Sequence, residues 1–391
     1  MNRPKPAAAH WPLPDCAARA VSEQLVEQIR GQCPLSFARF MAMSLYTPGL
    51  GYYSAGSRKF GAAGDFVTAP EITPLFGRAL AESCAAVLRM LPEGQVIELG
   101  AGSGRMAADL LLALEALGQL PARYCILEPS ADLRQRQAEH LAGAVPHLFG
   151  RVGWWETLPD EPLEAVVVAN EVLDALPVER FRVAEQGLEQ AMIVAEDPPG
   201  LALAWQAAEP ALGAWFGERL AGFALAEGYE SEACVMLDDW LPALAGVLHR
   251  GAMLLVDYGY ARREYYHPSR ERGTLMCHYR HRAHPDPLWL PGLQDITAYV
   301  DFTAVAEAAD RAGLQVAGFT TQAHYLLDVG LERLLAGVEA DGSVDYFRLV
   351  QAVKQLMLPG EMGERFKAML LTRGLEMAVP GFAGQDFRSR L

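Results

Sequence analysis

Residues 96–104 read VIELGAGSG, a short apolar strand followed by glycine at every second position. Glycine has no Cβ atom, so a glycine-rich backbone can approach a ligand closely and adopt left-handed conformations. The following run, RMAADLLLALEALG at 105–118, has apolar residues at helical spacing and ends in a glycine typical of a helix C-terminus. The stretch therefore predicts a strand–turn–helix unit that binds a nucleotide-like ligand.

The glycine spacing indicates which ligand the turn holds. The dinucleotide fingerprint is G-x-G-x-x-G, but here Gly100, Gly102 and Gly104 bring the third glycine one residue early. Glu98 precedes the turn, and E-x-G-x-G-x-G is the pattern of class I S-adenosylmethionine (SAM) methyltransferases. For a single glycine motif, a tight turn with no ligand is an equally good interpretation. We expect the backbone at the three glycines to contact SAM, the methyl donor. We expect Glu98 to hold the turn by binding its backbone N–H groups.

The next apolar strand supports a doubly wound α/β fold. YCILEPS at 124–130 ends in Glu128, about one helix and one turn beyond Gly104. An acid at the end of the second strand of such folds accepts hydrogen bonds from ribose hydroxyls. NAD and SAM both contain ribose, so Glu128 supports the predicted fold but does not distinguish between these two cofactors.

Composition limits the class of protein. The 391 residues are 51% hydrophobic and 21% charged, enough for a large core and two or three domains. No run of eighteen apolar residues and no signal-peptide core is present, so we expect no membrane span. Six cysteines without a CxxC pair indicate free thiols and a cytoplasmic protein. The net charge of −15 disfavours extended nucleic-acid binding.

Hydrophobic periodicity predicts three regions. These are an N-terminal helical cap and lid loop (1–94), a Rossmann-like SAM-binding core (95–259), and a C-terminal region with a basic insertion, a helical lid and closing strands (260–391). In the core, alternating strands and helices predict a parallel sheet with right-handed crossovers. The helices expected at 326–337 and 346–357 form either a lid or a homodimer surface. The other predicted elements are helices at 15–31, 36–47, from Pro74, and 303–314, and strands near 96–100, 124–128, 165–169, 252–257, 314–319 and 366–374.

Polar residues follow the strand AVVVAN at 165–170. Asn170, Glu171 and Asp174 come at its carboxyl end, which faces the ligand crevice in parallel sheets. The [DNS]-P-P-[YFW] motif of nucleobase amine methyltransferases is absent there, which argues against a nucleobase acceptor. Carboxylates at i and i+3 would share one face of a helical turn and suit a guanidinium. The alternative is an acidic helix N-terminus stabilised by the helix dipole.

Further motifs make the chain resemble a known family. They include YTPGLGYYS (46–54), GDFVTAPEITPLFG (64–77), ANEVLDALPVERF (169–181), LLVDYGY (254–260), GTLMCHYRHRAHPDPL (273–288) and DITAYVDFT (295–303). With the glycine turn, these motifs resemble the MidA-like family of SAM-dependent methyltransferases, over roughly residues 36–374. Eukaryotic members of that family assist assembly of mitochondrial respiratory complex I, and the mitochondrial member dimethylates an arginine of a core subunit.

The resemblance implies a class I methyltransferase with SAM as donor and a protein arginine, on a respiratory-complex or other subunit, as acceptor. Glu128 and Asn170 would then lie with the donor. Glu171, with Asp174 as a second carboxylate, would orient the guanidinium. Asp65, in the GDF loop, would close over donor or acceptor, or else be a surface turn residue.

The segment 260–287 is basic in an otherwise acidic chain. It holds six arginines and four histidines, and His278, His281 and His284 are spaced by three. No Asp, Glu or Cys pattern completes a metal signature, so we predict no metal site. We interpret the segment as a substrate-docking element, with RNA binding or a solvated insertion as alternatives.

Three other functions compete with arginine methylation. They are a SAM-binding assembly factor that acts through protein contacts, a methyltransferase for an RNA or small-molecule acceptor, and an NAD-dependent oxidoreductase. The displaced third glycine argues against the last of these.

Overall fold

The apolar strands assemble into one mixed sheet that forms the centre of the fold. The computed structural model describes residues 14–54, 68–197, 200–335 and 343–391. Within them, the main sheet has the strand order β15-β16-β10-β5-β2-β3-β4, with the short β14 beside β10. Its strands are β2 (Gln95–Leu99), β3 (Tyr124–Leu127), β4 (Val152–Trp155), β5 (Leu163–Asn170), β10 (Leu248–Tyr260), β14 (Val300–Asp301), β15 (Gln315–Thr321) and β16 (Phe366–Arg373).

The nucleotide-binding part of this sheet is parallel. β3, β2, β5 and β10 pair in parallel, with Leu99 opposite Ala169 and Val256 opposite Asn170. β16 runs antiparallel to both β10 and β15 and closes the sheet. The carboxyl ends of β2, β3, β5 and β10 therefore meet at one edge, as the doubly wound interpretation requires.

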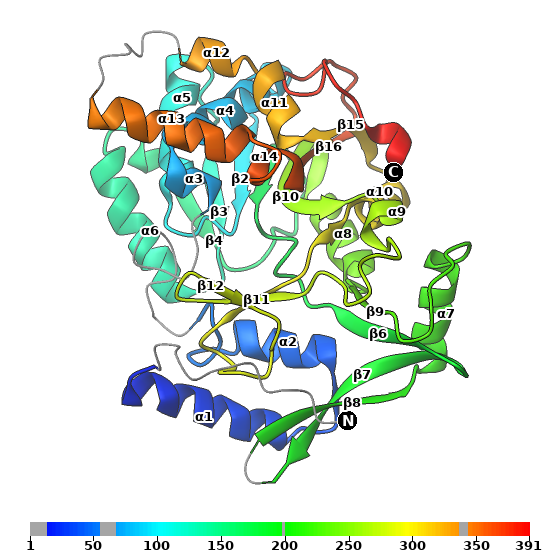
Figure 1. Ribbon diagram of the computed structural model, residues 1–391. Coiled ribbons are helices and arrows are strands. Elements are labelled where there is room, and N and C mark those ends of the chain that lie inside the picture. Colours follow the sequence, from blue (N-terminus) through cyan, green and yellow to red (C-terminus); the bar gives the residue numbers. More distant parts are fainter. Residues whose placement is uncertain (1–13, 55–67, 198–199, 336–342) are drawn as a thin grey trace.

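Alternating apolar side chains of the strands pack under two helical layers. Val96, Val168 and Leu254 face one core cluster, whereas Ile97 and Val167 face the other. Figure 1 shows the helices of the first layer on one side of the sheet and those of the second on the other. The first layer contains α4 (Pro74–Leu88), α5 (Arg105–Ala116) and α6 (Ala131–Ala144), and the second contains α8 (Leu237–Gly246) and α10 (Phe302–Arg311).

A second, antiparallel sheet is formed by β1 and by four strands that lie between β5 and β10 in the sequence, where no strand is predicted. It pairs β6 with β7 and β9, and β7 also with β8 and β1. In Figure 1 this sheet extends below the main sheet, beside α1 and α2. Its elements and their neighbours are β1 (Leu35–Ser36), β6 (Glu179–Ala184), β7 (Gly187–Glu196), β8 (Gly200–Ala207), β9 (Glu230–Ala233), α1 (Cys16–Arg30) and α2 (Phe37–Tyr46).

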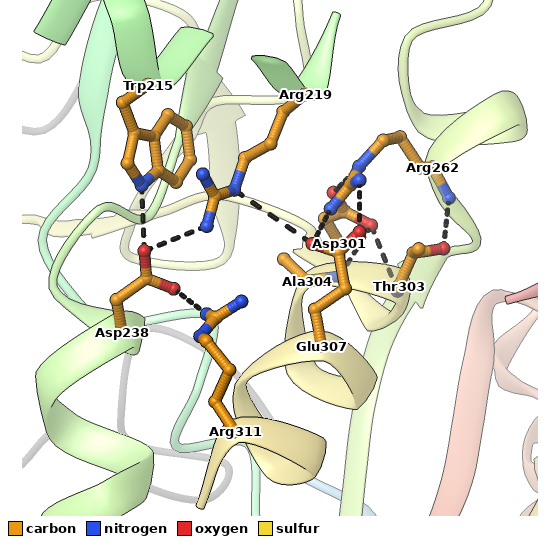
Figure 2. Close-up of polar contacts among 9 residues, drawn as sticks. All are labelled: Trp215, Arg219, Asp238, Arg262, Asp301, Thr303, Ala304, Glu307 and Arg311. Carbon is orange, nitrogen blue, oxygen red and sulfur yellow. Dashed lines mark hydrogen bonds and ion pairs between the residues drawn. The ribbon is translucent and has the colours of Figure 1, made fainter.

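An ion-pair network joins this second sheet to the main one (Figure 2). Asp238 of α8 accepts hydrogen bonds from Trp215 Nε1 and Arg219 Nη2, both at 2.8 Å, and both donors belong to α7 (Pro210–Arg219). Arg262 of α9 (Arg262–Tyr265) binds both carboxylate oxygens of Glu307 at 2.6 and 2.7 Å. The side chains of Arg219 and Arg262 are 10% and 12% exposed, so their contacts are screened less than those of fully exposed ion pairs.

A third sheet contains part of the basic segment. A hairpin of β11 (Met276–Tyr279) and β12 (Arg282–His284) pairs with β13 (Asp295–Thr297). Among the described residues, no helix is both long and apolar enough to cross a membrane.

Most of the predicted helices are confirmed, and their caps explain where they begin. Ser36 accepts a hydrogen bond from the backbone of Arg39 at 3.3 Å, and Thr73 caps α4. The helix expected at 326–337 is wrong in its extent, because Gly330 has φ +86° and separates two short helices. The remaining helices are α3 (Ala69–Ile72), α11 (Gln322–Asp328), α12 (Leu331–Leu334), α13 (Val344–Met357) and α14 (Met362–Arg365).

Candidate active site

The glycine turn after β2 has the backbone geometry that its sequence predicts. Gly100, Gly102 and Gly104 have φ of +60°, +54° and +82°, the left-handed region that favours glycine. Gly104 is the N-cap of α5, so helix-start N–H groups lie beside the turn. A Cβ atom at Gly100 would lie 3.3 Å from Val172 Cγ2, in the turn after β5. The two turns are therefore packed together at the carboxyl edge of the sheet.

Glu98 is fully buried below the turn, but its partner is not the one expected. Its Oε2 accepts a hydrogen bond from the Tyr124 hydroxyl at 2.7 Å, whereas Oε1 has no partner among the described residues. Burial raises the pKa of Glu98 to about 7, and the Tyr124 hydrogen bond opposes this rise. The expectation that Glu98 binds the N–H groups of the turn is wrong, because the side chain points toward β3.

Glu128 lies beside the glycine turn, as predicted, and Gln137 of α6 connects the two. Glu128 is 5% exposed, and its Oε1 accepts from the Ser130 backbone N–H at 2.9 Å. Gln137 Nε2 lies 3.1 Å from the Gly102 carbonyl oxygen and 3.3 Å from Glu128 Oε2. Sequence analysis missed Gln137, because one glutamine in a helix has no motif spacing.

The N-terminal region contacts the glycine turn through Glu71 of α3. Its carboxylate accepts a hydrogen bond from the Ser103 hydroxyl and lies 3.4 Å from Arg105 Nη1. Glu71 belongs to the quoted stretch GDFVTAPEITPLFG, but we had considered only Asp65 there. Asp65 lies outside the described residues.

Glu171 follows β5 in a strained conformation. Its φ is +53°, which for a residue with a side chain costs about 1–3 kcal/mol. Its backbone N–H donates to the Val256 carbonyl at 2.9 Å, and its Oε1 accepts from Asn170 Nδ2 at 3.2 Å and from the Ala69 N–H at 3.4 Å. Burial first, and then the charge of Asp174, raises the pKa of Glu171 to about 8. Asn170 Oδ1 is buried with no partner among the described residues.

Asp174 is 5% exposed and lies in the same charged group. Its Oδ2 accepts a hydrogen bond from the Tyr258 hydroxyl, whereas Oδ1 is buried and has no partner among the described residues. Burial raises the pKa of Asp174 to about 6, and the Tyr258 hydrogen bond opposes the rise. The predicted helical turn carrying Glu171 and Asp174 is wrong: no helix begins here. The physical reason is that the backbone N–H groups of 172–174 bind Asp257 and not preceding carbonyl groups.

Three aromatic residues and a further carboxylate surround this group. The Tyr46 hydroxyl donates to the Ala175 carbonyl at 2.8 Å, and the Tyr46 ring is 39% exposed. That ring stacks on Tyr53 with centroids 5.6 Å apart, and the Tyr53 hydroxyl donates to Asp295 Oδ1 at 3.0 Å. Sequence analysis missed Tyr46, Tyr53, Tyr258 and Asp295 as site residues, although they lie in quoted motifs.

The basic segment 260–287 is more ordered than a docking loop would be. Arg262 forms ion pairs with Asp301 and Glu307, and Arg270 stacks on the Tyr260 ring at 4.0 Å. Arg280 and His281 form the hairpin turn with φ of +48° and +60°, as a type I′ turn requires. Arg280, His281 and Arg282 are exposed at this tip. Substrate docking by this segment stays a prediction, and we now restrict it to the exposed hairpin tip.

The three histidines of this segment do not share one site. His278 lies on β11, His281 in the turn, and the buried His284 on β12 opposite Cys277. Within residues 14–54, 68–197, 200–335 and 343–391, no group of three or more His, Cys, Asp or Glu side chains is placed to hold a metal ion.

The geometry thus combines two functions at one edge of the sheet. A glycine turn with Glu128 beside it can hold a nucleoside with an amino-acid tail, and in the adjoining pair of acids Asp174 presents a carboxylate oxygen that has no partner among the described residues. The buried Asn170 and Asp174 oxygens without partners fit a ligand that brings N–H or O–H donors.

Comparison with known proteins identifies the nucleoside ligand. The chain matches a family of S-adenosyl-L-methionine-dependent methyltransferases over residues 79–320. It is similar to a Burkholderia thailandensis protein whose crystal structure contains S-adenosyl-homocysteine, with 40% identity, a TM-score of 0.93, and coverage of 98% of this chain and 100% of the other.

Two curated relatives extend the similarity over most of the chain. Protein arginine methyltransferase NDUFAF7, mitochondrial, from Danio rerio is 28% identical over 91% of this chain and 89% of that protein. The Homo sapiens protein of the same name is 27% identical over 89% of this chain and 82% of that protein. The cofactor is therefore SAM and not NAD, and the chain belongs to the S-adenosyl-L-methionine-dependent methyltransferase family with a class I methyltransferase fold.

Proposed function

We propose that this methyltransferase modifies a nitrogen of an arginine side chain in a protein substrate. The observation that carries the proposal is the carboxylate pair of the half-buried Glu171 and the buried Asp174, which adjoins the glycine turn through the close approach of Gly100 and Val172. The printed names of the curated relatives, which describe protein arginine methyltransferases, support the same acceptor.

On the donor side, the residues fit SAM. Left-handed glycines at 100, 102 and 104 leave the backbone open to the methionine portion, and Glu128 is placed to accept from ribose hydroxyls. The buried Asn170 oxygen can accept from the donor's ammonium group. When bound, SAM supplies a methyl group on a sulfonium sulfur and leaves as the neutral thioether S-adenosyl-homocysteine.

On the acceptor side, the charges fit a guanidinium. Glu171 and Asp174 form no ion pair with Lys, Arg or His within the part of the chain that the structure describes. A planar cation with several N–H donors would satisfy the unpartnered Asp174 Oδ1 and could also pair with the Glu171 carboxylate. The Tyr46 ring, which is partly exposed, offers an aromatic face beside them.

The two carboxylates also account for the proton. Forming a bond from an arginine nitrogen to the methyl carbon displaces one proton from that nitrogen, and the S–C bond electrons stay on sulfur. Glu171 has a raised pKa and is therefore the stronger proton acceptor of the pair. Carboxylates beside the other nitrogens would draw the positive charge toward them and leave the reacting nitrogen more nucleophilic.

The test compares methylarginine in cells with and without this gene. Mass spectrometry of tryptic peptides should find at least one protein that loses methylarginine when the gene is deleted and regains it with the wild-type gene. The purified enzyme should then methylate a peptide from that protein, but not the same peptide with lysine in place of the arginine. Equal methylarginine in both strains, together with transfer to a different acceptor in vitro, would refute arginine as the substrate.

Compartment and self-association remain proposals with their own support. All six cysteines are free thiols, which supports the reducing cytoplasm that we predicted. Val344 and Phe347 of α13 are 66% and 59% exposed, which supports a contact surface for a second copy on this helix. Light scattering of the purified protein and of a Phe347→Ser variant measures the second proposal directly: a dimeric wild type and a monomeric variant are expected.

A further inference from the structure

Asp257, at the carboxyl end of β10, has an unusual set of partners. Its side chain is fully buried, and its Oδ2 accepts three successive backbone hydrogen bonds, from Val172 at 3.1 Å, Leu173 at 2.9 Å and Asp174 at 3.2 Å. Its Oδ1 accepts from the Tyr258 backbone N–H at 2.9 Å. Four peptide dipoles thus solvate one carboxylate.

The hydrogen-bond donors around Asp257 are backbone groups. Among the described residues, Asp257 forms no ion pair with a Lys, Arg or His side chain. An ionised carboxylate is expensive to bury, and converging N–H groups stabilise it in the way that an anion-binding nest does. An apolar residue would fill the same space without that cost, so the carboxylate indicates a role beyond packing.

The three N–H groups belong to the turn that presents the acceptor carboxylates. Glu171, with φ +53°, begins this turn and is held to β10 by its own N–H bond to the Val256 carbonyl. The following N–H groups then converge on Asp257, which prevents the turn from relaxing into a helix. Val172 in the same turn is close to Gly100. By holding Val172, Asp257 therefore also fixes the distance between the 171–174 turn and the glycine turn at 100–104.

We propose that Asp257 is the positioning residue of the acceptor site: its side chain holds the 171–174 turn so that Glu171 and Asp174 face the donor. The proposal rests on the proposed acceptor function for its kinetic part. Its structural part concerns only the turn and stands independently of the substrate.

The side chains that face Asp257 include two acids and one lysine. Asp174 and Glu171 lie on the turn, the Tyr258 hydroxyl donates to Asp174, and Lys367 of β16 is opposite in the strand register. The Lys367 ammonium donates to the carbonyl groups of Glu364 and Arg365, and not to Asp257. Burial first, and then the charges of Asp174 and Glu171, hold the pKa of Asp257 well above its usual range, so we assign its effect on the turn to its hydrogen bonds.

Three variants separate positioning from simple stability. Asp257→Asn keeps the shape and an oxygen for the three N–H groups but removes the charge. Asp257→Ala removes the hydrogen bonds as well. Asp301→Asn is the matched control, because Asp301 also accepts two backbone N–H bonds, at 3.0 and 3.2 Å, but caps α10.

The first measurement is hydrogen exchange of the 172–174 amides, which needs no substrate. We expect exchange at least about tenfold faster in Asp257→Ala, and protection kept to within about tenfold in Asp257→Asn and Asp301→Asn. The second is the kinetics of methyl transfer, measured together with SAM binding. Displaced Glu171 and Asp174 carboxylates should lower kcat/KM for the methyl acceptor about tenfold or more in Asp257→Ala while SAM affinity changes little, and Asp257→Asn, which keeps an oxygen for the N–H groups, should recover most of that loss.

The outcomes are distinct. Unchanged exchange at 172–174 in Asp257→Ala would overturn the positioning role. If that variant does not fold, Asp257→Glu takes its place, because the longer side chain displaces the carboxyl group by one methylene; unchanged exchange at 172–174 and unchanged kcat/KM in that variant would do so. A wild-type enzyme that methylates no arginine refutes the proposed function alone, and the exchange result still decides the role of Asp257.

Discussion

The side-chain amide of Gln137 lies 3.1 Å from the carbonyl oxygen of Gly102. The same nitrogen reaches Glu128 at 3.3 Å, and the Gln137 oxygen accepts from Trp154 at 3.0 Å. One side chain on α6 thus joins the glycine turn, Glu128 and β4. The proposed donor site is held by this connection as well as by the conformation of its glycines.

The glycine turn gives the first prediction. Gly102→Val places a β-branched side chain at φ +54°, a conformation such residues avoid, and should abolish binding of SAM and S-adenosyl-homocysteine in calorimetric titration. Gly118→Val is the control, since Gly118 also has positive φ (+67°) but lies at the far end of α5 with open space around it. It should lower stability and leave SAM binding intact. Unchanged binding in Gly102→Val would remove the turn from the donor site.

The acceptor carboxylates give the second prediction. Glu171→Gln keeps the shape but turns an amide toward an N–H donor, and a charge-assisted hydrogen bond is worth about 1.5–3 kcal/mol. Methyl transfer should therefore fall about ten- to a hundredfold or more. SAM affinity should change little, and Asp174→Asn should show a smaller loss of the same kind. If Glu171→Gln lost SAM binding, Glu171 would be a residue of the SAM site. Unchanged turnover in both variants would contradict the proposal that these two carboxylates bind the acceptor guanidinium.

The pH dependence of activity follows from the raised pKa of Glu171. A proton acceptor works in its ionised form, so kcat/KM for the protein substrate should rise with pH until about 8. The charge of Asp174 contributes to that pKa, so Asp174→Asn should move the acid limb to lower pH, apart from any change in its height. A profile that is flat between pH 6 and 8 would argue against Glu171 as the acceptor.

Stability should show the opposite trend with pH. The folded-state pKa of Glu171 is raised from 4.5 to about 8, so folding favours its protonated form. The stability from this group is complete below about pH 4.5 and is lost as pH rises toward 8. Glu171→Gln cannot lose a proton, so its Tm should exceed that of the wild type by more at pH 8 than at pH 5. Glu139→Gln, at an exposed carboxylate, should show no such growing difference.

The hairpin tip gives the last prediction. Reversing Arg280 and Arg282 to Glu should raise the KM for the protein substrate, because the exposed tip attracts acidic surface around the target arginine. The effect should shrink as salt rises. Arg89→Glu with Arg123→Glu makes the same charge change at exposed sites near the opposite edge of the sheet and should leave KM unchanged. If the doubly substituted variant keeps the wild-type KM for the protein substrate at low salt, the hairpin is a solvated element without a docking role.

Local sequence determined the elements of the main sheet and the donor turn. The VIELGAGSG stretch, the acid after β3 and the strand AVVVAN each depend on neighbouring residues and on periodicities that one segment carries alone. The left-handed φ values at Gly100, Gly102 and Gly104 follow the same local rule, since glycine adopts them without strain. The second sheet escaped prediction because its short strands vary in burial and lack a clear alternation.

Only the tertiary structure decided how the acceptor site is built. Glu171 and Asp174 were recognised from their spacing, but the turn that carries them depends on Asp257, 83 residues beyond Asp174. Tyr53 meets Asp295 across 242 positions, and Ala69 meets Glu171 across 102. Such contacts carry no local signature, because they arise when strands and loops distant in the chain reach the same edge of the sheet. The raised pKa values of Glu171 and Asp174 result from burial in the folded protein. The sequence therefore predicts which acids belong to the site, whereas the fold determines how readily they bind a proton.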